Sequence, residues 1–122
     1  MAKLSNFKFY SHFKLDGEIE KIKFEARGYV DKKTDQIIYY FKNDNDYKFI
    51  IKNDIVEVSV NESFYSFVLN KKTEALINNA GYLYKASVVT NKLVILDNKV
   101  EIEYVMDFVS FKGVYKIILE LY

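Results

Sequence analysis

The side chains best suited to catalysis are few and isolated in this sequence. His12 is the only histidine, and the absence of cysteine excludes thiolate catalysis, disulfides and cysteine metal sites. The strand pattern around His12 points its side chain outward beside Lys21, with no second histidine or suitably placed serine to form a triad. We therefore expect a protein that is not an enzyme and that uses no cofactor.

Acidic and amide residues provide two candidates for a cation site. Glu101, Glu103 and Asp107 share one strand face. The expected register sets Glu120 opposite Glu103, which would shift a carboxyl pKa or hold a cation weakly, but a solvated outer wall is the favoured interpretation. The tetrad Asn-Asp-Asn-Asp at 43–46 lacks the glycine and the distal glutamate of an EF-hand, so it is expected to form a turn. No metal site is predicted.

Familiar ligand-binding motifs are also absent. The only arginine, Arg27, forms an Arg-x-Tyr pair with Tyr29 that is similar to the carboxylate clamp of cytosolic fatty-acid-binding proteins. Parity with Phe24 and Ala26 sends both side chains outward, however. The chain has no tryptophan for a lipocalin Gly-x-Trp element, and its four glycines form no phosphate loop. Any ligand-binding interpretation therefore depends on the architecture alone.

Two hairpins are the clearest structural signals. Asp16-Gly17 is a preferred two-residue turn, and closing it sets Phe9 opposite Phe24, Phe7 opposite Ala26 and Lys8 opposite Glu25. Gly28 in the second strand is expected to mark a bulge or a bend. At the other end of the chain, a loop at 110–113 would oppose these pairs: Phe108 and Tyr115, Met106 and Ile117, Tyr104 and Leu119, Ile102 and Leu121.

Short strands joined by tight turns fill the middle of the chain. They are expected at 36–42, 47–52, 55–60, 64–69, 73–77, 82–90 and 93–96, with Asx-rich breaks that favour turns. Such strands must hide one apolar face each, and short connections suit sequential neighbours. We predict an all-β fold, a closed antiparallel up-and-down barrel of about eight to ten strands, as one domain over residues 1–122. Its expected core contains Phe7, Phe9, Phe24, Tyr104, Met106, Ile117 and Leu119.

Composition restricts the partners. Half of the 122 residues are hydrophobic, 17% are aromatic and the formal net charge is +1, which argues against disorder and against nucleic acid or a membrane surface as partners. The first residues lack the apolar segment of a signal peptide, so a cytoplasmic protein is expected.

The order of several segments resembles a known family. Residues 24–28 (FEARG), 81–83 (GYL), 90–93 (TNKL), 100–104 (VEIEY) and 116–121 (KIILEL) resemble the YwiB-like family of small uncharacterised bacterial proteins across nearly the whole chain. The resemblance implies a calycin-like, or lipocalin-like, β-barrel. It implies no particular activity.

Two functions remain open from the sequence. The first, ranked slightly higher, is a protein-interaction module whose outer face binds a second copy or another protein through Ile38, Tyr40, Ile50, Phe64 and Val68. The alternative is a barrel whose interior holds a small apolar or amphipathic ligand, with Phe9, Phe24, Tyr104, Met106, Tyr115 and Ile117 as its expected contacts. The second function requires a cavity of at least about 300 Å³.

Overall fold

The computed structural model describes residues 2–15, 17–107 and 112–122. These residues form ten strands: β1 (Ala2–Leu15), β2 (Glu18–Lys32), β3 (Ile37–Asn43), β4 (Asn45–Lys52), β5 (Ile55–Val60), β6 (Ser63–Val68), β7 (Lys72–Asn79), β8 (Tyr82–Leu96), β9 (Lys99–Asp107) and β10 (Lys112–Leu121). Within those ranges there is no helical segment with the length and hydrophobicity of a membrane span.

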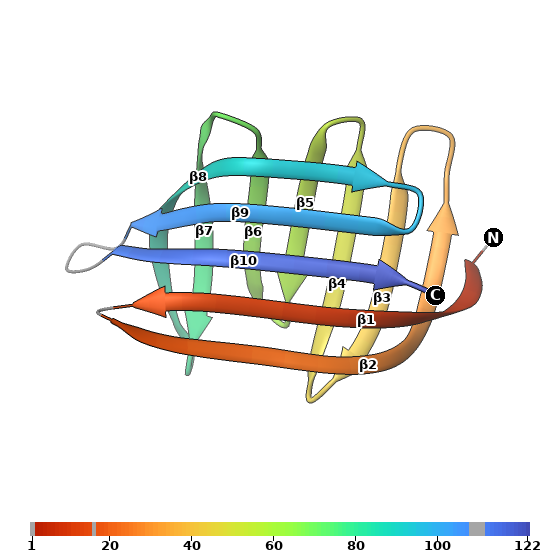
Figure 1. Cartoon of the computed structure of the whole chain (residues 1–122), viewed down its shortest axis with the longest axis horizontal. Coiled ribbons are helices and arrows are strands. Elements are labelled where there is room, and N and C mark those ends of the chain that lie inside the picture. The colour runs from red at the N-terminus through yellow and green to blue at the C-terminus, as the bar shows by residue number, and fades with distance from the viewer. Residues whose placement is uncertain (1, 16, 108–111) are drawn as a thin grey trace.

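Each strand pairs in antiparallel fashion with its sequence neighbours, and β10 pairs with β1 to close a barrel. The predicted closed antiparallel barrel is therefore confirmed. Figure 1 shows that the barrel is flattened into two layers, with β8, β9, β10, β1 and β2 running across strands β3 to β7. The long strands β2 and β8 bend from one layer into the other, which is how both layers belong to one continuous sheet.

The N-terminal hairpin has the predicted register. Phe9 lies opposite Phe24, Phe7 opposite Ala26, and Lys8 opposite Glu25, with 4.0 Å between the charged atoms of the last pair. The predicted turn residue Asp16 lies outside the described residues. Its neighbour Gly17 has a φ of 80°, a left-handed conformation that glycine adopts without a steric penalty.

The predicted register of the C-terminal hairpin is wrong by four residues. Tyr104 lies opposite Tyr115 and Met106 opposite Gly113, while Ile117 faces Ile102 and Leu119 faces Val100. Lys112 and Gly113, expected in the loop, belong to β10, whereas Phe108 and the rest of that loop lie outside the described residues. Because the shift is even, every side chain keeps its predicted face.

The charges agree with the observed register. The predicted register set Glu103 against Glu120, two like charges on neighbouring strands. In the structure Glu103 faces Lys116, Glu120 faces Lys99, and Asp107 faces Lys112 at 4.0 Å between charged atoms. Opposite charges therefore replace the predicted like-charge pair.

The middle strands are close to prediction, with one correction. The two strands expected at 82–90 and 93–96 are a single strand, β8, in which a register irregularity between Thr90 and Lys92 absorbs the intervening residue. The Asx-rich breaks are turns as expected. Positive φ angles occur at Asp44, Asn53, Asn61, Asn70 and Ala80.

The predicted core is confirmed. Six of the seven expected residues are buried, and Phe24 is partly buried against the same cluster. Gly28 is also buried, and the β1–β2 ladder runs through it without a register shift, so it is not a bulge but lies on the strand that bends between the layers. It stands where β2 begins to pair with β3, and a Cβ there would lie 1.9 Å from the carbonyl oxygen of Tyr40. The glycine is needed for this close approach of two backbones.

Candidate ligand-binding site at the barrel mouth

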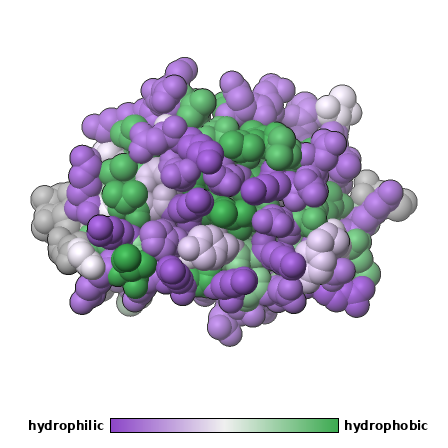
Figure 2. All heavy atoms as spheres, viewed as in Figure 1, coloured by the Kyte–Doolittle hydropathy of each residue, from purple (hydrophilic) through white to green (hydrophobic). Residues whose placement is uncertain are grey.

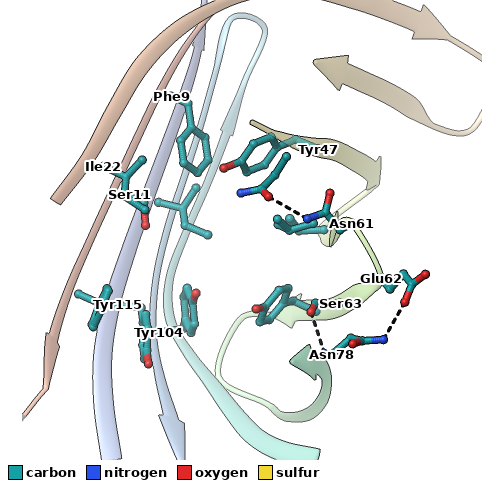
Figure 3. A pocket seen from close by; sticks show the side chains of 16 residues that line it. Phe9, Ser11, Ile22, Tyr47, Asn61, Glu62, Ser63, Asn78, Tyr104 and Tyr115 are labelled. Carbon is teal, nitrogen blue, oxygen red and sulfur yellow. Dashed lines mark hydrogen bonds between the residues drawn. The ribbon is translucent and has the colours of Figure 1, made fainter. Parts of the chain in front are cut away.

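A pocket of about 550 Å³ opens at one end of the barrel. It exists because β2 pairs with β3 only from Gly28 to Lys32, so the earlier part of β2 diverges from the second layer. The turns that connect β3 to β4, β5 to β6 and β7 to β8 form the opposite lip. Figure 3 shows Phe9, Ser11, Ile22 and Tyr115 on one side of the pocket and Tyr47, Asn61, Ser63 and Asn78 on the other.

The floor and walls of this mouth pocket are mainly aromatic. Tyr104 and Tyr115 stack with ring centroids 5.1 Å apart, and Phe13 stacks on Tyr115 at 5.4 Å. Phe9 packs against Tyr47 at 5.1 Å. These rings come from β1, β4, β9 and β10, whose inward faces meet only after the barrel closes. Aromatic walls of this kind offer a large apolar contact area to a flat ligand.

The lip is polar and is held in place by side-chain hydrogen bonds. The backbone N–H of Asp46 donates to Asn61 Oδ1 at 2.9 Å, and Asn61 Nδ2 donates to Asn45 Oδ1 at 2.8 Å. These bonds tie the β3–β4 turn to the β5–β6 turn.

A second set of bonds joins the β5–β6 and β7–β8 turns. The backbone N–H of Asn78 donates to Ser63 Oγ at 2.9 Å, and Asn78 Nδ2 donates to a Glu62 carboxylate oxygen at 2.7 Å (Figure 3). Asn78 Oδ1 accepts from the Gly81 N–H at 3.1 Å. Between β6 and β7 the described residues show one register pair, Phe64 with Leu76, so these side-chain bonds also support a short ladder.

Burial favours the protonated form of three phenols in the pocket, those of Tyr65, Tyr104 and Tyr115. Burial raises the pKa of Tyr104 well above its usual value of 10.0, and the nearby phenols of Tyr65 and Tyr115 act in the same direction. Burial also raises the pKa values of Tyr65 and Tyr115. At neutral pH the pocket therefore presents uncharged hydroxyl groups.

Four of the six interior residues named from the sequence line this pocket: Phe9, Tyr104, Tyr115 and Ile117. Phe24 instead packs behind Phe9, with centroids 5.0 Å apart, and Met106 is buried away from the pocket. The sequence reasoning missed Tyr47 and Tyr65, and it treated the lip asparagines as turn residues only. Their inward parity could have identified the tyrosines, and the up-and-down order of the strands puts the three turns at one end of the sheet, but nothing local indicates that these turns face the rings of β1, β9 and β10.

The five residues of the predicted interaction patch do not form one surface. Ile38 is only 4% exposed, although it lies on the outer face, and Ile50 and Val68 are half-buried. Tyr40 and Phe64 are exposed, but Lys48 on β4 and Ser59 on β5 stand between them in the ladder.

The exposed neighbours of Tyr40 lie in the other direction. Tyr29 on β2 faces Tyr40, and Leu4 on β1 faces Tyr29, so three exposed apolar side chains form a continuous row across three strands. Lys48 Nζ lies 5.4 Å from the centroid of the Tyr40 ring, a cation–π contact at the end of that row.

The acidic strand face is occupied by lysines. Glu101 is buried and lies 2.5 Å from Lys92 Nζ and 3.5 Å from Lys99 Nζ, and the hydrogen bond from Lys92 lowers its pKa. Lys92 also contacts Glu103 at 3.5 Å. In the described part of the chain no three His, Cys, Asp or Glu residues are grouped to hold a metal ion.

His12 lies opposite Lys21 on β2, as predicted, and opposite Lys116 on β10. Its ring lies parallel to that of Tyr10, with centroids 6.5 Å apart. Figure 2 shows the outer face of this layer as mainly hydrophilic, with hydrophobic side chains in separate groups. His12 is not among the residues that line the mouth pocket, although its chain neighbours Ser11 and Phe13 are.

Comparison with solved structures places this architecture beside a known one. The crystal structure of the YwiB protein from Bacillus subtilis superposes with a TM-score of 0.72, covering 98% of this chain and 92% of that one. The chain has the YwiB fold. At 18% identity the YwiB likeness concerns the fold alone. No protein-family model and no curated protein matches the sequence.

Proposed function

We propose that this protein is a non-catalytic binding protein that holds one small, largely apolar molecule in the mouth pocket. The observation that carries the proposal is the pocket itself, a space of about 550 Å³ that remains between aromatic side chains beside the buried core. Pockets that bind drug-sized molecules occupy about 300 to 1,000 Å³ and combine apolar walls with a few polar groups.

The composition of the pocket matches that description. Tyr104, Tyr47 and Phe9 are buried at its base, whereas Asn61 is exposed at its rim. A ligand would therefore bury its apolar part against rings and keep its polar part near the lip.

The interaction module, ranked first from the sequence, is now the second candidate because its patch is interrupted. The row of Leu4, Tyr29 and Tyr40 is the observation that favours it, since exposed aromatic side chains often anchor protein interfaces. Three side chains supply much less apolar area than a stable interface usually needs, about 800 Å² on each partner. We therefore rank binding in the pocket higher.

Filling the pocket tests the proposal. Ser11 lies on β1, lines the pocket and is half-buried, so Ser11→Trp would occupy the space that a ligand needs. Lys14→Trp places the same side chain on the same strand at an exposed position outside the pocket. Because the chain has no tryptophan, each variant also carries a single fluorescent reporter.

The probe is the neutral dye N-phenylnaphthylamine, whose fluorescence rises in apolar sites. We expect the wild type and Lys14→Trp to bind it with equal affinity, and Ser11→Trp to lose at least about tenfold in affinity, or about 1.4 kcal/mol. Circular dichroism must show the same β-sheet content in all three proteins. Equal dye binding by folded Ser11→Trp would show that the pocket is not the binding site, and no binding by the wild type would oppose the proposal directly.

A further inference from the structure

Hydrogen bonds fix the orientation of the side-chain amides at the lip of the mouth pocket. Backbone N–H groups determine which way two of its amides point, since an N–H can donate only to the amide oxygen. Asp46 N–H fixes Asn61 in this way, and Gly81 N–H fixes Asn78. With its oxygen engaged, Asn61 must turn its Nδ2 toward Asn45, and it donates to Asn45 Oδ1.

Each of the three amide oxygens therefore already accepts a hydrogen bond from the protein. Ser63 Oγ accepts as well, from Asn78 N–H. The amide N–H groups are less fully used. Asn61 and Asn78 each donate one of their two amide N–H groups to a protein partner, and Asn45 Nδ2 donates to no protein group among the described residues. The lip therefore keeps amide N–H groups that no protein group uses and that can donate to a molecule in the pocket.

The charge of the pocket restricts the acceptor that these donors would meet. No lysine or arginine is among the described residues that line it, and its one charged lining residue is Glu62. Glu62 would repel a carboxylate that is bound beside it at the lip. A neutral carbonyl or ring nitrogen accepts the same hydrogen bonds without that penalty.

The shape of the walls restricts the rest of the molecule. Tyr104 and Tyr115 stack nearly parallel, with 9° between their ring planes, and Phe13 continues the stack at 22° to Tyr115. A stack of this kind offers a flat molecule the free face of its end ring on one side of the pocket, while Tyr47 and the lip lie on the other side (Figure 3).

We propose that the pocket selects an uncharged, flat aromatic molecule that carries a carbonyl or ring-nitrogen acceptor, which binds the amide donors of Asn45 and Asn61. This inference rests on the proposed function, because it specifies the ligand of the same pocket. A barrel with an arginine clamp in its interior would bind a carboxylate ligand. The only arginine of this chain, Arg27, lies on the exposed outer face of β2, so the pocket has no such clamp.

Three probes with one skeleton test the ligand class: naphthalene carboxamide, naphthalene carboxylate and naphthylmethylammonium, each titrated calorimetrically at neutral pH and constant ionic strength. We expect the carboxamide to bind at least about tenfold more tightly than either charged probe. Equal or tighter binding of the carboxylate or the ammonium would overturn the inference while leaving binding in the pocket intact. No binding of any probe, or binding that survives Ser11→Trp, would overturn the proposed function and the inference with it.

One substitution tests the donors themselves. Asn45→Asp keeps the oxygen that accepts from Asn61 but removes the N–H donors, so the lip can remain assembled. Asn43→Asp is the matched control, because Asn43 is the register partner of Asn45 in the same turn, receives the same charge and does not line the pocket.

We expect Asn45→Asp to weaken carboxamide binding about tenfold, and Asn43→Asp to change it less than about twofold. Thermal unfolding of both variants checks that the turn is retained. Equal affinities in the two folded variants would show that the lip donors do not contact the probe.

Discussion

Adding one methyl group at Gly28 tests the feature that shapes the barrel and its mouth. Gly28 is buried at the first residue pair between β2 and β3, where the two layers join. Gly28→Ala places a Cβ 1.9 Å from the backbone oxygen of Tyr40 and 2.9 Å from both Phe41 Cβ and Phe7 Cε2. The first of these contacts involves backbone, which cannot rotate away as the end of a side chain can.

The expected cost follows from that distance. Ordinary contact begins at 3.4 Å, so β2 and β3 would have to separate by about 1.5 Å at this position. Overpacking costs about 1 to 3 kcal/mol, and each ladder hydrogen bond lost with the separation adds about 1 kcal/mol. We expect Gly28→Ala to lower the free energy of unfolding by about 3 to 5 kcal/mol, a large part of the stability of a small domain.

Urea unfolding followed by far-UV circular dichroism measures this loss, and Gly17→Ala is the control. Gly17 has a φ of 80° and nothing within 4 Å of an added Cβ, so its substitution carries only the conformational cost of about 1 to 2 kcal/mol. If Gly28→Ala lowers the free energy of unfolding no more than Gly17→Ala does, the close approach of β2 and β3 at Gly28 is not a determinant of stability. That result would refute the reasoning.

Two further predictions concern the pocket phenols and the outer row. Because burial raises the pKa of Tyr104, the unfolded chain loses this proton near 10.0 while the folded protein keeps it, so stability falls as the pH rises above that value. In Tyr104→Phe the fall should be less steep by up to about 1.4 kcal/mol per pH unit, measured by urea unfolding in alkaline buffers; an unchanged slope would contradict burial of the phenol. The second candidate function is tested by the double variant Tyr29→Lys and Tyr40→Lys. It should leave dye binding unchanged but abolish any self-association seen in sedimentation velocity. A wild-type protein that is monomeric at high concentration would rule out self-association as the role of the outer row.

The local patterns of this sequence were sufficient for the strand faces and most turns. Alternation with period two places Phe7 and Phe9 inside whichever partner strand they meet, because a strand points successive side chains to opposite sides. Asx residues tolerate positive φ, so Asn53 and Asn61 could be assigned to turns without knowledge of the fold.

The same patterns determined which face each side chain of the C-terminal hairpin takes, but not which residue lies opposite it. A register shift by an even number of residues keeps every side chain on the same face of the sheet. The hydrophobic pattern therefore could not distinguish Tyr104 opposite Leu119 from Tyr104 opposite Tyr115. The charges could have done so, since the observed register brings Glu103 to Lys116 and avoids the pairing with Glu120.

The outer patch and the mouth pocket were decided by the tertiary structure. Parity showed that Ile38 is on the outer face but not that it is buried there, because burial depends on neighbouring strands and on how the sheet bends. Likewise, the turns that carry Asn45, Asn61 and Asn78 face the rings of β1, β9 and β10 only when the barrel closes. Local sequence determines how each strand and turn is built, whereas a pocket is the space left between strands distant in the chain, and its size depends on the curvature that closure imposes on all of them.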